Sequence, residues 1–268
     1  MICVTSAHGA PGVTTLSLLI AGCWPRPTAV IEADPSGGVL AVRYGLGRSP
    51  GLADLAARVG THASESALWS SAQTLPGGLR VVVAPESGEV ASGILDDVAG
   101  SLARWLRQLD GVDVVVDCGR SIPGSPTGAL MTVADAVLVV ARTSPDQLYS
   151  AAHRTHALAA QADAGAVGVV LVGDGPHGAD EVADQLKVDV LGVVADDPRT
   201  AGAFAGEGAA RSTRRSPLVR SAGTLVDGLA GRLGVTGVVE GAAHLKSATR
   251  ARRADQTASE STPVGGRR

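Results

Sequence analysis

The chain has 268 residues, of which 45% are hydrophobic, so it is long enough and apolar enough to bury a sizeable core. Only 2% are aromatic, and we therefore expect that core to consist mainly of Val, Leu, Ala and Ile. The formal net charge of −3 is too small to argue for or against binding to a nucleic acid.

The three cysteines (Cys3, Cys23 and Cys118) have no C-x-x-C spacing, which argues against a zinc or disulfide framework. We therefore expect all three cysteines to be small hydrophobic side chains buried in the core. No apolar run approaches the roughly 18 residues of a membrane-spanning helix. The first residues lack the basic segment of a signal peptide. We therefore expect a cytoplasmic protein.

Strand and helix patterns alternate along the chain, which predicts an α/β fold: a doubly wound, mainly parallel sheet with helices on both faces. The predicted strands are 2–6, 28–33, 79–84, 113–117, 136–141, 167–172 and 190–194. The predicted helices are 14–24, 39–44, 52–59, 64–72, 89–109, 145–163, 179–187, 198–205 and 217–233.

The hydrophobic pattern ends near residue 241. We therefore predict one domain over 1–240, followed by a disordered basic and polar tail over 241–268. The segment 246–268 carries a net charge of +4, which leaves −7 for the rest of the chain.

The first predicted strand runs into a turn containing Gly9 and Gly12, and the hydroxyl pair Thr14-Thr15 then opens a helix. This order of elements predicts a phosphate cradle, because glycine leaves the backbone N–H groups accessible and the helix dipole adds positive charge. A P-loop also places a lysine immediately before its hydroxyl residue. In this chain that position holds Val13.

The segment His8-Gly-Ala-Pro-Gly-Val-Thr-Thr15 resembles the deviant Walker A motif of the ParA/MinD family of P-loop ATPases, K-G-G-x-G-K-T-T. His8 stands at the signature lysine, Ala10 replaces a glycine and Val13 replaces the P-loop lysine. The cofactor-binding residues implied by the resemblance are His8, Gly9, Ala10, Pro11, Gly12, Val13, Thr14 and Thr15.

Three later segments resemble the same family in the same order. Val30–Gly38 is similar to its L-x-D-x-D-P-x-G motif, which implies that Asp34 is the catalytic residue beside the attacking water. Asp113–Gly119 is similar to its Walker B strand, shortened by one residue, which implies that Asp117 and Thr14 hold the metal. Ala134–Val140 is similar to the family's A-D-x-V-L-V-V strand.

The resemblance implies the P-loop NTPase fold and a site for ATP or ADP with Mg²⁺, but both lysines are absent. The alternatives are a very weak ATPase, a pseudo-ATPase that only binds nucleotide, and a nucleotide-free fold. Arg43 or Arg120 could supply the missing charge, although the sequence does not fix their direction. The adenine-contacting Asn-Arg pair of the family is missing from 172–174.

The individual residues also have structural interpretations. His8 could be a pH-dependent phosphate contact or a loop residue that faces solvent. Asp34 could begin a turn before Pro35. Asp117 could cap the corner where the strand becomes a loop.

For function, the resemblance implies a positioning or regulatory protein that acts through a protein partner, with a homodimer as one arrangement. Degenerate members resemble the TadZ/CpaE proteins of pilus assembly, and other members partition chromosomes or plasmids. Non-specific DNA is a second candidate partner, through Arg211, Arg214, Arg215 and Arg220. MinD proteins end in an amphipathic membrane helix. In this chain, Val264 is the only aliphatic residue after Leu245 other than alanine. We therefore expect no stable membrane insertion.

A Rossmann-type dinucleotide binder is a further alternative, because Gly9 and Gly12 follow a first strand and an acid (Glu32 or Asp34) lies about 20 residues on. However, G-x-G-x-x-G is not met.

Overall fold

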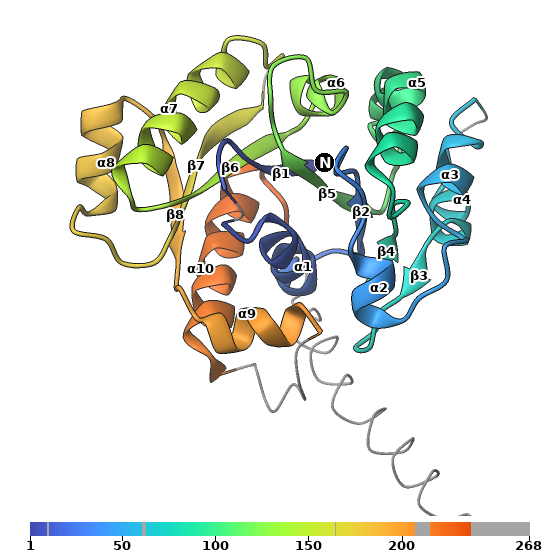
Figure 1. The fold of residues 1–268 in the computed structure, drawn as a ribbon, viewed down its shortest axis with the longest axis horizontal. Coiled ribbons are helices and arrows are strands. Elements are labelled where there is room, and N and C mark those ends of the chain that lie inside the picture. The colour runs from blue at the N-terminus through green and yellow to red at the C-terminus, as the bar shows by residue number, and fades with distance from the viewer. Residues whose placement is uncertain (10, 61–62, 164, 207–214, 237–268) are drawn as a thin grey trace, which may run out of the picture.

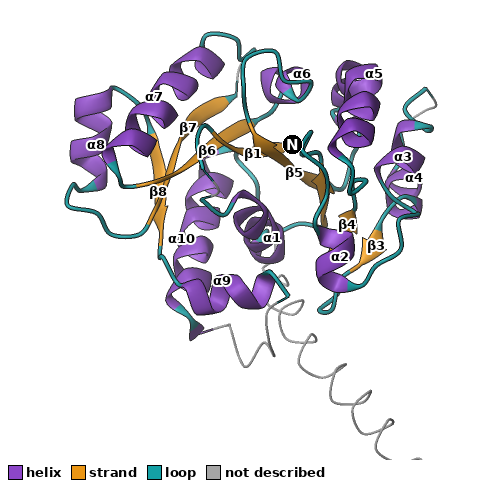
Figure 2. Ribbon diagram, in the orientation of Figure 1, coloured by secondary structure: helices purple, strands orange, loops and turns teal. Residues whose placement is uncertain are grey.

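The computed structural model describes residues 1–9, 11–60, 63–163, 165–206 and 215–236. An eight-stranded sheet forms the middle layer, in the order β3-β4-β2-β5-β1-β6-β7-β8. Figure 2 shows these strands as one twisted layer between helices. The strands are β1 (Ile2–Ser6), β2 (Thr28–Glu32), β3 (Gln73–Thr74), β4 (Arg80–Val82), β5 (Asp113–Arg120), β6 (Ala136–Arg142), β7 (Ala166–Val172) and β8 (Val190–Val194).

All strand pairs are parallel except β3 with β4. This confirms the predicted doubly wound, mainly parallel α/β fold. In a Rossmann sheet the second strand lies beside the first. Here β5 separates β2 from β1, so the dinucleotide-binder alternative is wrong on topology.

Helices cover both faces of the sheet. They are α1 (Val13–Cys23), α2 (Leu40–Tyr44), α3 (Leu52–Ala56), α4 (Glu65–Ser70), α5 (Gly88–Leu106), α6 (Gly128–Thr132), α7 (Pro145–Ala159), α8 (Ala179–Leu186), α9 (Pro198–Phe204) and α10 (Pro217–Arg232). In Figure 1, α5 to α8 lie on one side of the sheet, while α1, α9 and α10 lie on the other.

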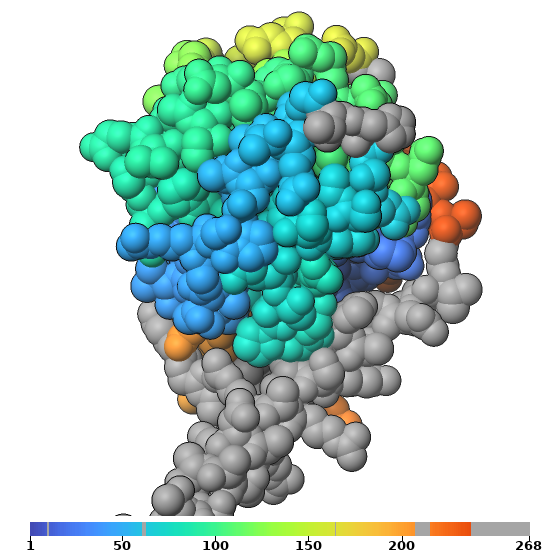
Figure 3. Space-filling model, turned by 90° about the vertical axis from the view of Figure 1, so that its right-hand side faces the viewer, coloured from blue at the N-terminus to red at the C-terminus, as the bar shows by residue number. Residues whose placement is uncertain are grey.

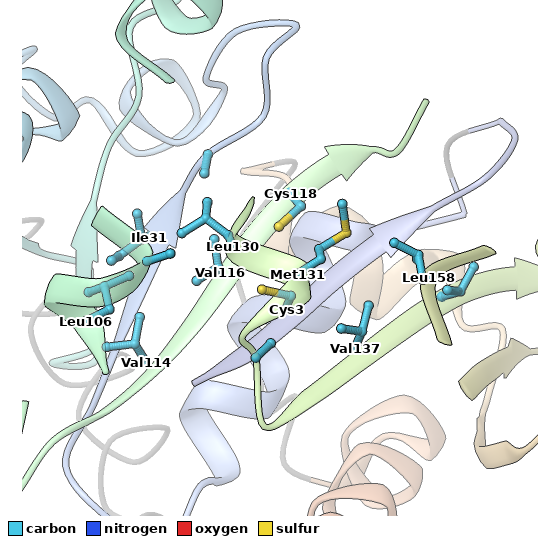
Figure 4. Packing of buried hydrophobic residues seen from close by; sticks show 14 of the residues in the cluster. Cys3, Ile31, Leu106, Val114, Val116, Cys118, Leu130, Met131, Val137 and Leu158 are labelled. Carbon is cyan, nitrogen blue, oxygen red and sulfur yellow. The ribbon is translucent and has the colours of Figure 1, made fainter. Parts of the chain in front are cut away.

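The continuous apolar runs of the inner strands result from burial on both faces. In β6, Val137 and Val139 face the α5–α8 side, whereas Leu138 and Val140 face the α1–α10 side. Figure 4 shows the first side, where side chains from β1, β5 and β6 meet Leu130 and Met131 of α6.

The thiols of Cys3 and Cys118 lie fully buried in this layer, as expected, whereas Cys23 is only partly buried. All three are free thiols.

The β3 end of the sheet is covered by the segment between β2 and β4, which contains α2, α3 and α4 (Figure 3). Sequence patterns predicted these helices but not β3 or α6. Two residues in β3 are too few to show a period, and α6 begins with a glycine, which is a poor helix former. One prediction needs a larger correction: β5 does not end at Asp117 but continues to Arg120, so Asp117 caps no corner.

The described residues up to 236 form one sheet with its helices, and the predicted tail over 241–268 lies outside the described residues. Within the described ranges, every helix is too short or too polar to cross a bilayer.

Candidate functional site

The turn between β1 and α1 lies at the carboxyl edge of the sheet, beside its central strands (Figure 1). Gly9 and Gly12 both have positive φ angles, 67° and 103°, which residues with a Cβ rarely adopt. Gly12 is the N-cap of α1 and has no side chain to bond the first turn, which also lacks an acidic residue. The free N–H groups of this turn therefore remain available to an anion.

At the position of the P-loop lysine, Val13 is only 8% exposed. It belongs to the apolar cluster between α1, α10 and the sheet, together with Leu16. The loop therefore presents an apolar group where a P-loop presents an ammonium. Pro11 is also buried, Thr14 and Thr15 are half-buried, and Ala10 lies outside the described residues.

His8, at the signature-lysine position, is exposed. It lies near Asp146 in the first turn of α7. A hydrogen bond with Ser144 holds the pKa of Asp146 below its usual range, and His8 contributes to the same shift. This placement agrees with the interpretation of His8 as a solvent-facing loop residue.

Asp117 is the most perturbed acid of the site, with 1% of its surface exposed. Burial raises its pKa from 3.8 to about 7, and the nearby carboxylates of Glu32 and Asp34 act in the same direction. The Thr14 hydroxyl and the Gly119 N–H oppose this shift. Oδ1 accepts from the Gly119 N–H at 3.1 Å, but no described residue makes a hydrogen bond of normal geometry to Oδ2.

Asp34 follows β2 and turns towards the same place. Its Oδ1 accepts a hydrogen bond from the Ser36 N–H at 2.8 Å, which also makes it the start of a turn. Its carboxyl group packs directly on Gly119, where a Cβ atom would overlap it. The structure therefore brings Asp34, Asp117 and Thr14 together.

We expect Gly119→Ala to lower the free energy of unfolding by more than the roughly 1–2 kcal/mol that a left-handed φ costs. The φ at Gly119 is 58°, and the added methyl group must also displace the Asp34 carboxyl. Urea unfolding measures the effect. Gly124→Ala is the matched control, since φ there is 78° with open space around the Cβ position. Equal losses in the two variants would contradict the proposed contact.

Glu32, at the position of the motif's first Asp, has a structural role that the sequence did not reveal. Its Oε1 accepts from the N–H groups of Val39 and Leu40 at 2.7 and 3.0 Å, and its Oε2 accepts from Ala84 at 2.9 Å. Burial is the main cause that raises its pKa. Glu32 therefore ties the segment that carries Asp34 to the chain after β4.

A cavity of about 980 Å³ opens over the turn and α1. Arg43 and Arg120 line it, so both side chains proposed to replace the lysine face the site. They come from α2, within the predicted helix 39–44, and from the end of β5. Arg142 also lines the cavity, and sequence reasoning missed it. Arg142 directly follows the predicted strand 136–141, but its place beside β1 depends on the strand order, which leaves no local signal in the sequence.

No protein-family model matches this sequence, and no curated protein is similar to it at a significant level. Solved structures are similar to it in fold. MinD from Pyrococcus horikoshii OT3, complexed with Mg-ADP, superposes with a TM-score of 0.67 over 87% of this chain and 97% of that one, at 15% identity. A ParA family ATPase from Chlorobium tepidum TLS gives 0.67 over 84% and 98%, at 16% identity. MinD in the MinC:MinD complex of Aquifex aeolicus gives 0.61 over 88% and 96%, at 15% identity.

The chain has the MinD/ParA fold. In this fold the turn before α1 is called the P-loop. The motifs in the sequence predicted the same order of elements: β1, then the P-loop, then α1. A second cavity of about 160 Å³ adjoins the P-loop, lined by apolar side chains of α1 and by Arg142 and Asp196.

The MinD/ParA fold implies a magnesium ion, and the residues present are compatible with one. Within the described ranges, no group of three His, Cys, Asp or Glu side chains could hold a metal alone. Magnesium commonly takes one or two carboxylates and completes its shell with water and phosphate oxygens. The unpartnered Oδ2 of Asp117 beside Thr14 fits that pattern.

Proposed function

We propose that the protein is a positioning or regulatory protein of the MinD/ParA type, with a degenerate, lysine-less nucleotide site, that acts through protein partners. It binds ATP or ADP with Mg²⁺ weakly and turns over little ATP. The observation that carries this proposal is Val13, which fills the lysine position with a buried apolar side chain.

The comparisons support the ligand and the mode of action. MinD from P. horikoshii binds Mg-ADP, and MinD from A. aeolicus forms a complex with MinC. The cavity over the P-loop of this chain is large enough for a nucleotide. For the cargo, we retain the types implied by the sequence: chromosome or plasmid partitioning, or TadZ/CpaE-like localisation of a pilus or secretion apparatus, with a homodimer as one arrangement.

Each group in the site has a proposed role. The N–H groups at the start of α1 bind phosphate oxygens, and Thr14 and Asp117 hold the magnesium, which would offset phosphate charge when bound. Asp34 orients the attacking water. Without a lysine in the loop, the charge that develops in the transition state lacks its nearest cation, so turnover is slow.

Phosphate release from Mg-ATP tests the catalytic part of this proposal. We expect the wild type to release phosphate at the rate of an Asp34→Ala variant, both close to the rate without protein. A rate of about 0.1 s⁻¹ or more that falls with Asp34→Ala would show a competent ATPase and overturn the proposal.

Duplex DNA is the second partner that we propose. The observation in its favour is that Arg215, just before α10, and Arg220, in its first turn, are both exposed. Arg211 and Arg214 lie outside the described residues. Against it stands the charge of −7 on the chain before residue 246.

If four to six arginines neutralise phosphates, log K plotted against log[salt] should have a slope of about −4 to −5, without sequence preference. A gel-shift series with long duplex measures this slope. Arg215→Gln with Arg220→Gln should reduce it by about 2, whereas Arg104→Gln, on an exposed site of α5, should not. Absence of retardation at low salt would remove DNA from the list of partners.

A further inference from the structure

The site lacks a cation in its own loop, but the sheet supplies cations from neighbouring strands. In the order of the sheet, β1 lies between β5 and β6 (Figure 1). Both flanking strands end in an arginine. The last residue of β1, Ser6, is paired with Arg120 of β5 and with Val140 of β6. Arg142 lies two residues beyond that pair. Because the strands are parallel, both arginines reach the edge where the P-loop begins.

The two guanidinium groups differ in how far they are already neutralised. Arg142 Nη1 donates to Asp196 Oδ2 at 2.6 Å, so its charge is paired. Arg120 Nη2 makes a long contact, 3.5 Å, with the carbonyl oxygen of Gly9 in the P-loop. Among the described residues Arg120 has no ion pair, and it is exposed at the cavity.

Arg43 is the third arginine that lines the cavity, but it is only partly exposed, and within the described residues no hydrogen bond joins its side chain to the P-loop. Arg120 is therefore the arginine that combines an unpaired guanidinium, a contact with the P-loop and access to the cavity. A guanidinium has five N–H donors in a planar fork and can bind two phosphate oxygens at once.

We propose that Arg120 is the principal phosphate-binding cation of this site, in place of the absent loop lysine. The ligand class is a di- or triphosphate anion, bound between the N–H groups of α1 and the Arg120 guanidinium. Arg142 contributes less, because binding must compete with Asp196. This inference rests on the proposed nucleotide site and names the residue that supplies its charge.

Calorimetry on the full chain tests it with two probes, Mg-ATP and inorganic tripolyphosphate. Arg120→Gln should weaken the binding of both by about 10- to 100-fold, since it removes a charge-assisted contact. Arg142→Gln should weaken them less. Arg104→Gln removes an exposed arginine of α5 that does not line the cavity, and it should leave both affinities unchanged. Thermal unfolding of each variant shows whether it is folded.

The outcomes separate this inference from the proposed function. If Arg120→Gln is folded and binds both probes like the wild type, Arg120 is not the phosphate cation, while the nucleotide site stands. If tripolyphosphate binds in an Arg120-dependent way and Mg-ATP does not bind, the arginine site stands and the nucleotide proposal fails. If the wild type binds neither probe at millimolar concentration, both are wrong.

Discussion

Replacing Asp117 with Asn should raise the melting temperature of the magnesium-free protein by about 5–10 °C more at pH 8 than at pH 5. The pKa of Asp117 is raised from 3.8 to about 7, mainly by burial. Because the pKa of Asp117 is higher in the folded than in the unfolded state, the free energy of unfolding falls as the pH rises from 3.8 through about 7. Over pH 5 to 8 the ionisation of Asp117 costs about 2–3 kcal/mol, and Asn avoids this cost.

Thermal unfolding followed by circular dichroism, at several pH values with a chelator present, measures this difference. Asp97→Asn, an exposed position on α5, is the matched control and should change little at any pH. Millimolar Mg²⁺ at pH 8 should stabilise the wild type more than Asp117→Asn, because only the carboxylate attracts the ion. A gain in stability from Asn that is the same at pH 5 and pH 8 would contradict the raised pKa.

Replacing Val13 with Lys should strengthen the binding of Mg-ATP by about 10- to 100-fold, the gain expected from one charge-assisted contact with phosphate. Val13 lies at the start of α1 beside Gly12 and Thr14, and it also lines the cavity. A lysine there can extend from the edge of the apolar cluster into the cavity, where it would meet the phosphates.

The control for this variant is Val13→Met, because methionine is long and unbranched like lysine but carries no charge. Fluorescent-nucleotide binding at two salt concentrations measures both variants. Only the lysine variant should gain affinity, and its gain should shrink as the salt concentration rises. If both variants bind ATP like the wild type, the missing charge is not what limits affinity.

The sequence predicted the strands well because burial on both faces makes them continuous apolar runs, such as Val137 to Val140 in β6. The resemblance singled out Asp34, Asp117 and Thr14, and the structure places all three at one edge, since the carboxyl ends of parallel strands meet there. The strand order, which decides against a Rossmann sheet, depends on long-range pairing and leaves no local pattern.

The roles of individual polar groups were harder to predict. Glu32 resembles a catalytic-motif acid, but three backbone N–H groups fix it as an anchor, and those come from segments up to 52 residues away. Arg142 was missed because its value depends on β6 lying next to β1. Gly119 lies within β5, beyond the predicted end of this strand at Asp117, and its missing side chain makes room for Asp34.

Calorimetric titration of the purified full chain with Mg-ATP tests most directly whether this is a nucleotide site without a loop lysine. We predict saturable binding with a dissociation constant between about 10 μM and 1 mM. Asp117→Asn should weaken this binding in the presence of magnesium, because it removes the carboxylate that holds the ion. A dissociation constant of about 1 μM or lower for the wild type, or no heat of binding at millimolar ATP, would contradict the proposal of a weak nucleotide site.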